Sequence, residues 1–212
     1  MNRTAFLVDG FNLYHSLKVA SEDLGGVTTK WLDLRSLCVS YLSSIGNGAR
    51  LESLIYFSAF ASYREAVDPD VTARHRAYIE CLTAAGVDVR LGKFKEKEVT
   101  CPRCGRPVRR HEEKETDVAI GVELVDLFWR DACDSAVLVT GDSDLVPAVR
   151  VAQGRFPAKR IYSLFPHRRR SFELAGLVAA KFRIRADRYL RHQLPNPCPV
   201  GGGRSVPKPA TW

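Results

Sequence analysis

The sequence predicts an α/β fold, a three-layer αβα sandwich around a mainly parallel sheet. Short apolar runs of β-forming residues recur along the chain with helical patterns between them, which is typical of parallel βαβ units. The runs are Ala5–Val8, Leu54–Phe57, Val87–Leu91, Ala136–Val139 and Arg160–Leu164. The chain has 212 residues, 45% of them hydrophobic, and is therefore long enough for one such domain with a buried core.

The helices between these runs have recognisable boundaries. Two helices are predicted in the first connection, because Gly25 and Gly26 interrupt the apolar pattern there. A further helix begins near Asp70 and ends before Gly86, and glycine is common just past a helix end. The apolar stretch TDVAIGVELVDLFWR, starting at Thr116, predicts a long helix that leads into the fourth strand.

Composition divides the chain into one domain, an insert and a tail. We expect a folded domain over residues 1–192, with a basic, cysteine-containing insert at about 95–113. The remainder, residues 193–212, is rich in proline and glycine, which predicts a disordered tail or a linker.

Charge and targeting signals narrow the class of protein. The formal net charge of +8 favours a polyanionic partner such as nucleic acid, although excess charge can also serve solubility. The N-terminal segment lacks the features of a secretory signal, no run is long enough to span a bilayer, and the six cysteines do not form a secreted disulfide pattern. We therefore expect a soluble, cytoplasmic protein that does not act at a membrane.

Acidic residues follow two of the predicted strands and begin one predicted helix. Asp9, with Asn12 three residues later, ends the first strand, Asp142 and Asp144 follow the fourth, and Asp117 lies in the first turn of the helix at Thr116. Because the carboxyl ends of parallel strands meet at one edge of a sheet, these carboxylates are expected on one rim. Taken singly, each aspartate could instead be a turn former or a helix cap.

A cluster of carboxylates repels itself unless a cation occupies it. Oxygen ligands without nearby histidine or cysteine favour Mg²⁺ or Mn²⁺ over zinc. Such a site can activate water for attack on a phosphodiester and neutralise charge on the phosphate. The sequence therefore predicts a metal site for Mg²⁺ or Mn²⁺ at this rim.

Three segments together resemble a known family. FLVDGFNLYHSL, EEKETDVAIGVELVDL and DSAVLVTGDSDLVPAVR are similar, in order and spacing, to the NYN domain, a branch of the PIN-like ribonuclease superfamily that includes the LabA-like group. The resemblance covers about residues 4–187. It implies a Rossmann-like, PIN-like sandwich and metal-dependent cleavage of RNA. Asp9, Asp117, Asp142 and Asp144 match the family's acidic metal-binding set, and Asn12 is the polar residue that accompanies the first aspartate.

The insert carries a candidate zinc site. Cys101 and Cys104 are separated by two residues, which lets both thiolates face one ion, and His111 is the nearest third ligand. A closed zinc site needs four ligands, so a distant side chain or a second subunit would have to complete it. The alternative is an exposed basic loop whose cysteines are free or paired with each other.

Basic residues before the acidic helix and after the fifth strand are candidate phosphate contacts. Glu112 and Glu113 are expected to be solvated, and Lys114 is either a phosphate contact or a solvated lysine. The candidates for RNA binding are Arg103, Arg109, Arg110, Lys114, Arg168, Arg169 and Arg170.

These features support one principal function and two alternatives. The principal reading is a metal-dependent ribonuclease that hydrolyses RNA phosphodiester bonds. The first alternative is an RNA-binding or regulatory NYN module with little turnover, and the second is a hydrolase of small phosphate esters. The sequence leaves the oligomeric state open, a homodimer included.

Overall fold

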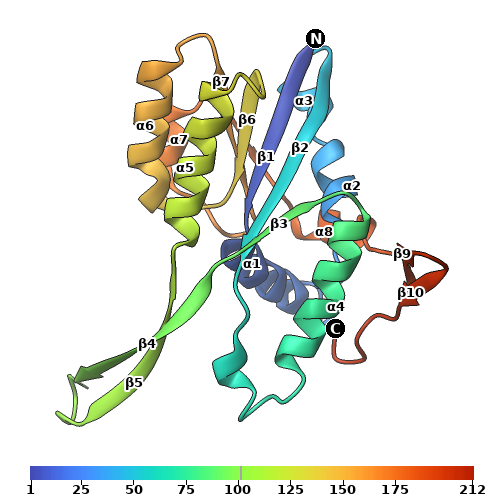
Figure 1. Ribbon diagram of the computed structural model, residues 1–212, viewed down its shortest axis with the longest axis vertical. Coiled ribbons are helices and arrows are strands. Elements are labelled where there is room, and N and C mark those ends of the chain that lie inside the picture. Colours follow the sequence, from blue (N-terminus) through green and yellow to red (C-terminus); the bar gives the residue numbers. More distant parts are fainter. Residues whose placement is uncertain (101) are drawn as a thin grey trace.

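A six-stranded sheet organises the chain, as Figure 1 shows for a computed structural model that describes residues 1–100 and 102–212. All neighbouring strands run parallel. In spatial order the strands are β3 (Asp88–Leu91), β2 (Ala49–Ser58), β1 (Asn2–Asp9), β6 (Ser135–Val139), β7 (Arg160–Phe165) and β8 (Ala180–Arg183). The predicted α/β fold is confirmed, and the five predicted strands all fall within this sheet or overlap it. The edge strand β8 was not predicted.

Helices cover both faces of the sheet and make the outer layers of the sandwich (Figure 1). One face carries α1 (Gly10–Asp23), α2 (Leu34–Val39), α3 (Leu42–Ile45), α4 (Val71–Ala84) and α8 (Ala186–Arg191). The other face carries α5 (Thr116–Trp129), α6 (Val146–Arg155) and α7 (Phe172–Leu177). None of the helices in the described ranges combines the length and the apolar character that crossing a bilayer requires.

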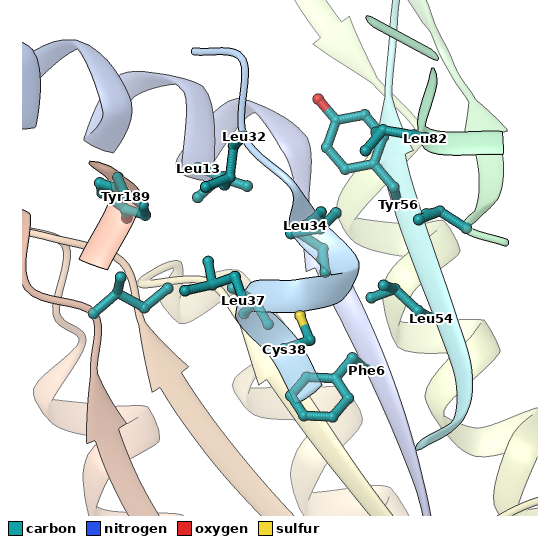
Figure 2. Packing of buried hydrophobic residues seen from close by; sticks show 14 of the residues in the cluster. Phe6, Leu13, Leu32, Leu34, Leu37, Cys38, Leu54, Tyr56, Leu82 and Tyr189 are labelled. Atoms are coloured by element: carbon teal, nitrogen blue, oxygen red, sulfur yellow. The ribbon is translucent and has the colours of Figure 1, made fainter. Parts of the chain in front are cut away.

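Strand β1 supplies both halves of the core because its side chains alternate between the two faces. Phe6 and Val8 pack under the α1 side, whereas Ala5 and Leu7 pack under α5 and α6. Figure 2 shows the first half, where Phe6 lies near Cys38 and Leu54. All the core side chains of β1 are buried, so the strand is held firmly and the position of its carboxyl end is well defined.

The order of the strands creates a switch point between β1 and β6. From β1 the chain moves outward through β2 to β3, and it then returns to β6 and moves outward the other way through β7 to β8. Connections after β1 and β6 therefore lead in opposite directions, and such a switch point is expected to leave a crevice at the carboxyl ends of the two strands. Ligands of open α/β sheets bind in such crevices, and both predicted acidic strand ends lie here.

The insert forms an antiparallel hairpin rather than a loop. Strand β4 (Lys93–Thr100) pairs with β5 (Pro107–Lys114), and Figure 1 shows the hairpin reaching away from the sheet. Charged side chains fill most positions of both strands, so the sequence lacks the alternation of apolar and polar residues by which strands are recognised. After β5, Glu115 adopts a φ of 81° and turns the chain directly into α5.

The segment after residue 192 is folded, which differs from the predicted disorder. It forms a small hairpin of β9 (Cys198–Gly201) and β10 (Arg204–Val206). Cys198 is buried, and the ring of Trp212 lies 5.6 Å from that of Tyr78 on α4. A few apolar side chains therefore anchor a segment whose proline and glycine content suggested a linker.

Candidate metal centre

Asp9 lies at the carboxyl end of β1 and caps α1. Its Oδ1 accepts a hydrogen bond of 2.9 Å from the backbone N–H of Asn12, and its Oδ2 accepts one of 2.8 Å from the hydroxyl of Thr140. The residue is only 5% exposed. Burial raises the pKa of this carboxyl, the two hydrogen bonds oppose that change, and the nearby charge of Asp142 adds to it.

Asp142 follows β6 and caps the short 3₁₀ helix η2 (Ser143–Leu145). Its Oδ1 accepts a hydrogen bond of 3.0 Å from the N–H of Asp144, and its own N–H donates to the Thr140 hydroxyl at 3.0 Å. Asn12 Oδ1 accepts a bond of 3.0 Å from the N–H of Gly141. Asn12 and Thr140 thus tie the ends of β1 and β6 together, so Asn12 acts here through the backbone of the neighbouring loop.

Asp117 enters the same crevice from the first turn of α5. Burial raises the pKa of its carboxyl to about 6, and the charges of Asp9, Asp142 and Asp144 contribute in that order. Carboxylate oxygens of Asp9, Asp117 and Asp142 all lie within 4.8 Å of one another. Three residues that lie between 25 and 133 positions apart in the sequence therefore form one acidic group.

The fourth predicted aspartate lies outside this group. Asp144 is exposed on η2 and shares with Asp117 the wall of a hollow between α5 and α6. Its charge still contributes to the raised pKa of Asp117. Its place in the structure is therefore that of a neighbour to the three-carboxylate group.

The three carboxylates fit a small divalent cation. Ligand oxygens of one octahedral Mg²⁺ lie about 3.0 Å apart when adjacent and about 4.2 Å apart when opposite, since each bond is about 2.1 Å. The three carboxylates, all within 4.8 Å of one another, would therefore draw closer together around an ion. The donors are all oxygen, as Mg²⁺ and Mn²⁺ prefer. Burial, together with the charge of neighbouring carboxylates, raises the pKa of Asp9 and Asp117, and a cation would favour their ionised forms.

Glu113, which the sequence suggested would be solvated, reaches the edge of the same site. It lies near the end of β5 and is half-buried, and its Oε1 is buried without a hydrogen-bond partner among the described residues. Burial raises the pKa of the carboxyl to about 7, with further contributions from Asp117 and Asp9. Side chains two residues apart in a strand point to the same face, so His111 and Glu113 share one face of β5. Recognising the insert as a strand would therefore have indicated that Glu113 is not simply solvated.

Lys114 and Arg109, two other basic residues of β5, pair with glutamates of the hairpin. Lys114 Nζ donates to Glu112 Oε2 at 2.8 Å, and Arg109 Nε lies 3.4 Å from Glu96 Oε1. Arg103 and Arg110 are exposed. These cations lie on the hairpin that leads into the acidic helix.

The loop after β7 packs against the centre. A Cβ on Gly141 would lie 2.7 Å from the carbonyl carbon of Arg169, so only glycine allows this close approach. Arg168, at a φ of 55°, forms an ion pair of 2.9 Å with Asp23. The guanidinium of Arg170 lies 4.5 Å from the centre of the Phe172 ring.

The described residues do not assemble the candidate zinc site. Cys101 lies outside the described residues, and Cys104 is exposed and free. His111 lies four residues along β5 from Pro107, where the strand pairing stops, which is about 13 Å at the usual rise of a strand. Its ring stacks on Tyr63 with centroids 4.1 Å apart. Among the described residues, the aspartate group is the one cluster with spacing suited to a metal.

Comparison with known proteins agrees with this geometry. The family model of the NYN domain matches residues 3–175. The chain belongs to the NYN domain family. This family lies within the PIN-like nuclease superfamily, and the three clustered aspartates are all inside the matched region.

A solved structure supports the fold of this NYN chain. A crystal structure of a protein of unknown function from Vibrio parahaemolyticus RIMD 2210633 is similar with a TM-score of 0.57 and 19% identity, over 86% of this chain and 93% of that one. At this identity the likeness concerns the fold alone. No curated protein matched the sequence.

Proposed function

We propose that this NYN protein is a metal-dependent ribonuclease that hydrolyses RNA phosphodiester bonds with Mg²⁺ or Mn²⁺. The observation that carries the proposal is the group of Asp9, Asp117 and Asp142, whose oxygens lie within 4.8 Å of one another in a chain of the PIN-like nuclease superfamily. These three side chains would hold the ion. When bound, the ion supplies activation of water and neutralisation of charge on the phosphate oxygens.

The protein's own contribution is to hold the ligands in place before the ion arrives. Thr140 and Asn12 each bond across from one strand end to the other, which fixes Asp9 beside the loop that carries Asp142. Fixed ligands need little reorganisation during the reaction. Asp144, further out, would act through a water molecule.

Basic residues on two separate elements favour a polymer over a small ester. The hairpin with Arg103, Arg109 and Arg110 leads into α5, and the loop with Arg169 packs against Gly141 beside Asp142. The net charge of +8 agrees with a polyanionic substrate. A small phosphate ester would not require cations on both the hairpin and this loop.

Cleavage assays on purified protein test this proposal. Labelled single-stranded and hairpin RNAs, together with a generic phosphate ester, are incubated with Mg²⁺, Mn²⁺ or EDTA. We expect metal-dependent cleavage of RNA that falls at least 100-fold in Asp142→Asn, since removing one group that stabilises charge in a transition state has effects of about this size. Asp70→Asn is the matched control, because Asp70 is exposed and is not one of the three clustered aspartates.

Other results of these assays would favour one of the two alternative functions, an RNA-binding module or a hydrolase of small esters. Tight RNA binding without cleavage under all metal conditions would support an RNA-binding or regulatory module. Hydrolysis of the generic ester without cleavage of RNA would contradict the ribonuclease proposal.

A further inference from the structure

A second cavity, of about 640 Å³, lies beside the acidic group and has no part in binding the ion. Gly10, which directly follows Asp9, and Glu113 both line it. The carboxyl of Glu113 also feels the charges of Asp117 and Asp9, so the cavity and the three aspartates share an edge. A substrate that reaches the aspartates can therefore extend into this cavity.

Aromatic side chains from four separate elements form one wall. The ring of Phe94 on β4 lies 5.3 Å from that of Phe11 on α1 and 5.0 Å from that of Tyr63 on the 3₁₀ helix η1 (Ser62–Arg64). Tyr63 is stacked on His111 of β5 with an angle of 5° between the rings, yet it remains 40% exposed. The wall offers flat surfaces of the kind on which nucleobases stack.

Cations also line the cavity. Lys30 lies 6.0 Å from the centre of the Tyr14 ring, and Arg64 and Arg74 line the same space. Burial lowers the pKa of Lys30, and the charges of Lys18 and Arg74 lower it further, so positive groups are crowded here. Arg74 pairs with Asp68, but its Nε is buried with no hydrogen-bond partner in the described part of the chain. An anion in the cavity would relieve this crowding.

Neutral polar groups line the cavity as well. His75 Nε2 lies 3.5 Å from the hydroxyl of Ser58, and burial lowers the pKa of this imidazole to about 4. A neutral imidazole and a hydroxyl can each donate or accept a hydrogen bond. Both residues line the cavity, and they offer the pairing groups that reading the edge of a base requires.

We propose that this cavity binds one nucleotide of the RNA next to the phosphate at the three aspartates. The base lies against the wall formed by Tyr63, Phe94 and Phe11, its edge meets Ser58 and His75, and its phosphate meets Lys30 and Arg74. The cavity thereby selects the base beside the cleaved bond. The inference rests on the proposed ribonuclease function for its place in the reaction, but binding of the nucleotide itself does not need turnover.

Calorimetric titration of the full chain with each of the four nucleoside 5′-monophosphates, in EDTA, tests the proposal. We expect at least one to bind, and Tyr63→Ala to weaken that binding about tenfold because one stacking surface is lost. Tyr63→Phe keeps the ring and should retain wild-type affinity. Trp129→Ala removes an exposed aromatic ring at the far end of α5 and is the matched control.

A second variant separates the phosphate from the base. Lys30→Ala should weaken binding of the monophosphate several-fold and leave binding of the corresponding nucleoside unchanged. Thermal unfolding of each variant checks that it is folded. Absence of binding by all four monophosphates, or equal affinities for wild type and Tyr63→Ala, would overturn the inference.

The same variants distinguish failure of the inference from failure of the proposed function. If the protein cleaves RNA and Tyr63→Ala alters neither mononucleotide affinity nor the base preferred beside the cut, the cavity is not a nucleotide site and the ribonuclease proposal stands. If no RNA is cleaved but mononucleotide binding is lost in Tyr63→Ala, the cavity inference stands without the ribonuclease.

Discussion

The hydroxyl of Thr140 donates a buried hydrogen bond of 2.8 Å to Oδ2 of Asp9. The same hydroxyl accepts the N–H of Asp142 at 3.0 Å. One side chain thus connects the two aspartates that end the central strands β1 and β6. The arrangement makes Thr140 a positioning residue for the metal centre.

Replacing Thr140 with valine should lower the free energy of unfolding by about 2 kcal/mol at pH 7, because a buried charged acceptor loses its hydrogen bond. Thr140→Ser keeps the hydroxyl and should lose only about 0.8 kcal/mol for the missing methyl group. Urea denaturation measures both values. Equal losses in the two variants would show that the hydroxyl contributes little.

Gly141→Ala should lower the free energy of unfolding by about 1–3 kcal/mol, because the new methyl group would force the Arg169 backbone away. Gly154→Ala in α6 is the matched control, since a Cβ there meets nothing within 4 Å. Alanine should leave stability unchanged or raise it by up to about 1 kcal/mol at that position. A loss of similar size in both variants would contradict the tight contact at Gly141.

The raised pKa of Asp117 predicts how the effect of replacing this residue on stability changes with pH. In the folded, metal-free protein this carboxyl ionises near pH 6, above the ordinary value of 3.8. Its contribution to stability is therefore fully present below about pH 4 and is lost as pH rises through 6. Asp117→Asn in EDTA should thus gain thermal stability relative to wild type between pH 4.5 and pH 7.5.

This difference between variants is more informative than the pH profile of the wild type. The lowered pKa of His75 acts in the opposite direction, because that imidazole must stay neutral to remain buried and so adds stability as pH rises. Melting temperatures of wild type, Asp117→Asn and Asp70→Asn across this range give the comparison. A constant offset between wild type and Asp117→Asn would contradict the raised pKa.

Mn²⁺ should stabilise the wild-type protein. A ligand at 100 times its dissociation constant adds about 2.7 kcal/mol, which corresponds to a rise of about 5–10 °C in melting temperature for a chain of this size. Asp142→Asn should lose most of this rise, whereas Asp70→Asn should keep it. An equal rise in all three proteins would place the ion elsewhere.

The sequence was sufficient for the central strands and for the grouping of Asp9, Asp117 and Asp142. The buried strands are continuous apolar runs, and parallel strands bring their carboxyl ends to one edge of the sheet. These regularities are local or follow from topology, so they can be predicted without coordinates.

Features that depend on distant packing were not predictable in the same way. The edge strand β8 is short and half charged. The final segment is anchored by distant contacts, among them those of Trp212 with Tyr78 and Trp31. Glu113 was missed because β5 carries charges at most positions, which conceals the alternation that turns Glu113 toward Asp117. Tertiary contacts outweighed composition at each of these places.

Single-turnover cleavage of a labelled single-stranded RNA at increasing Mn²⁺ concentration tests the central claim most directly, with Mn²⁺ binding measured by calorimetry on the same preparations. We predict that half-maximal cleavage occurs near the dissociation constant for Mn²⁺, that Asp142→Asn loses both binding and cleavage, and that Asp70→Asn retains both. Cleavage by Asp142→Asn at the wild-type rate, or cleavage by the wild type that persists in EDTA, would contradict the claim that the three aspartates form a metal-dependent catalytic centre.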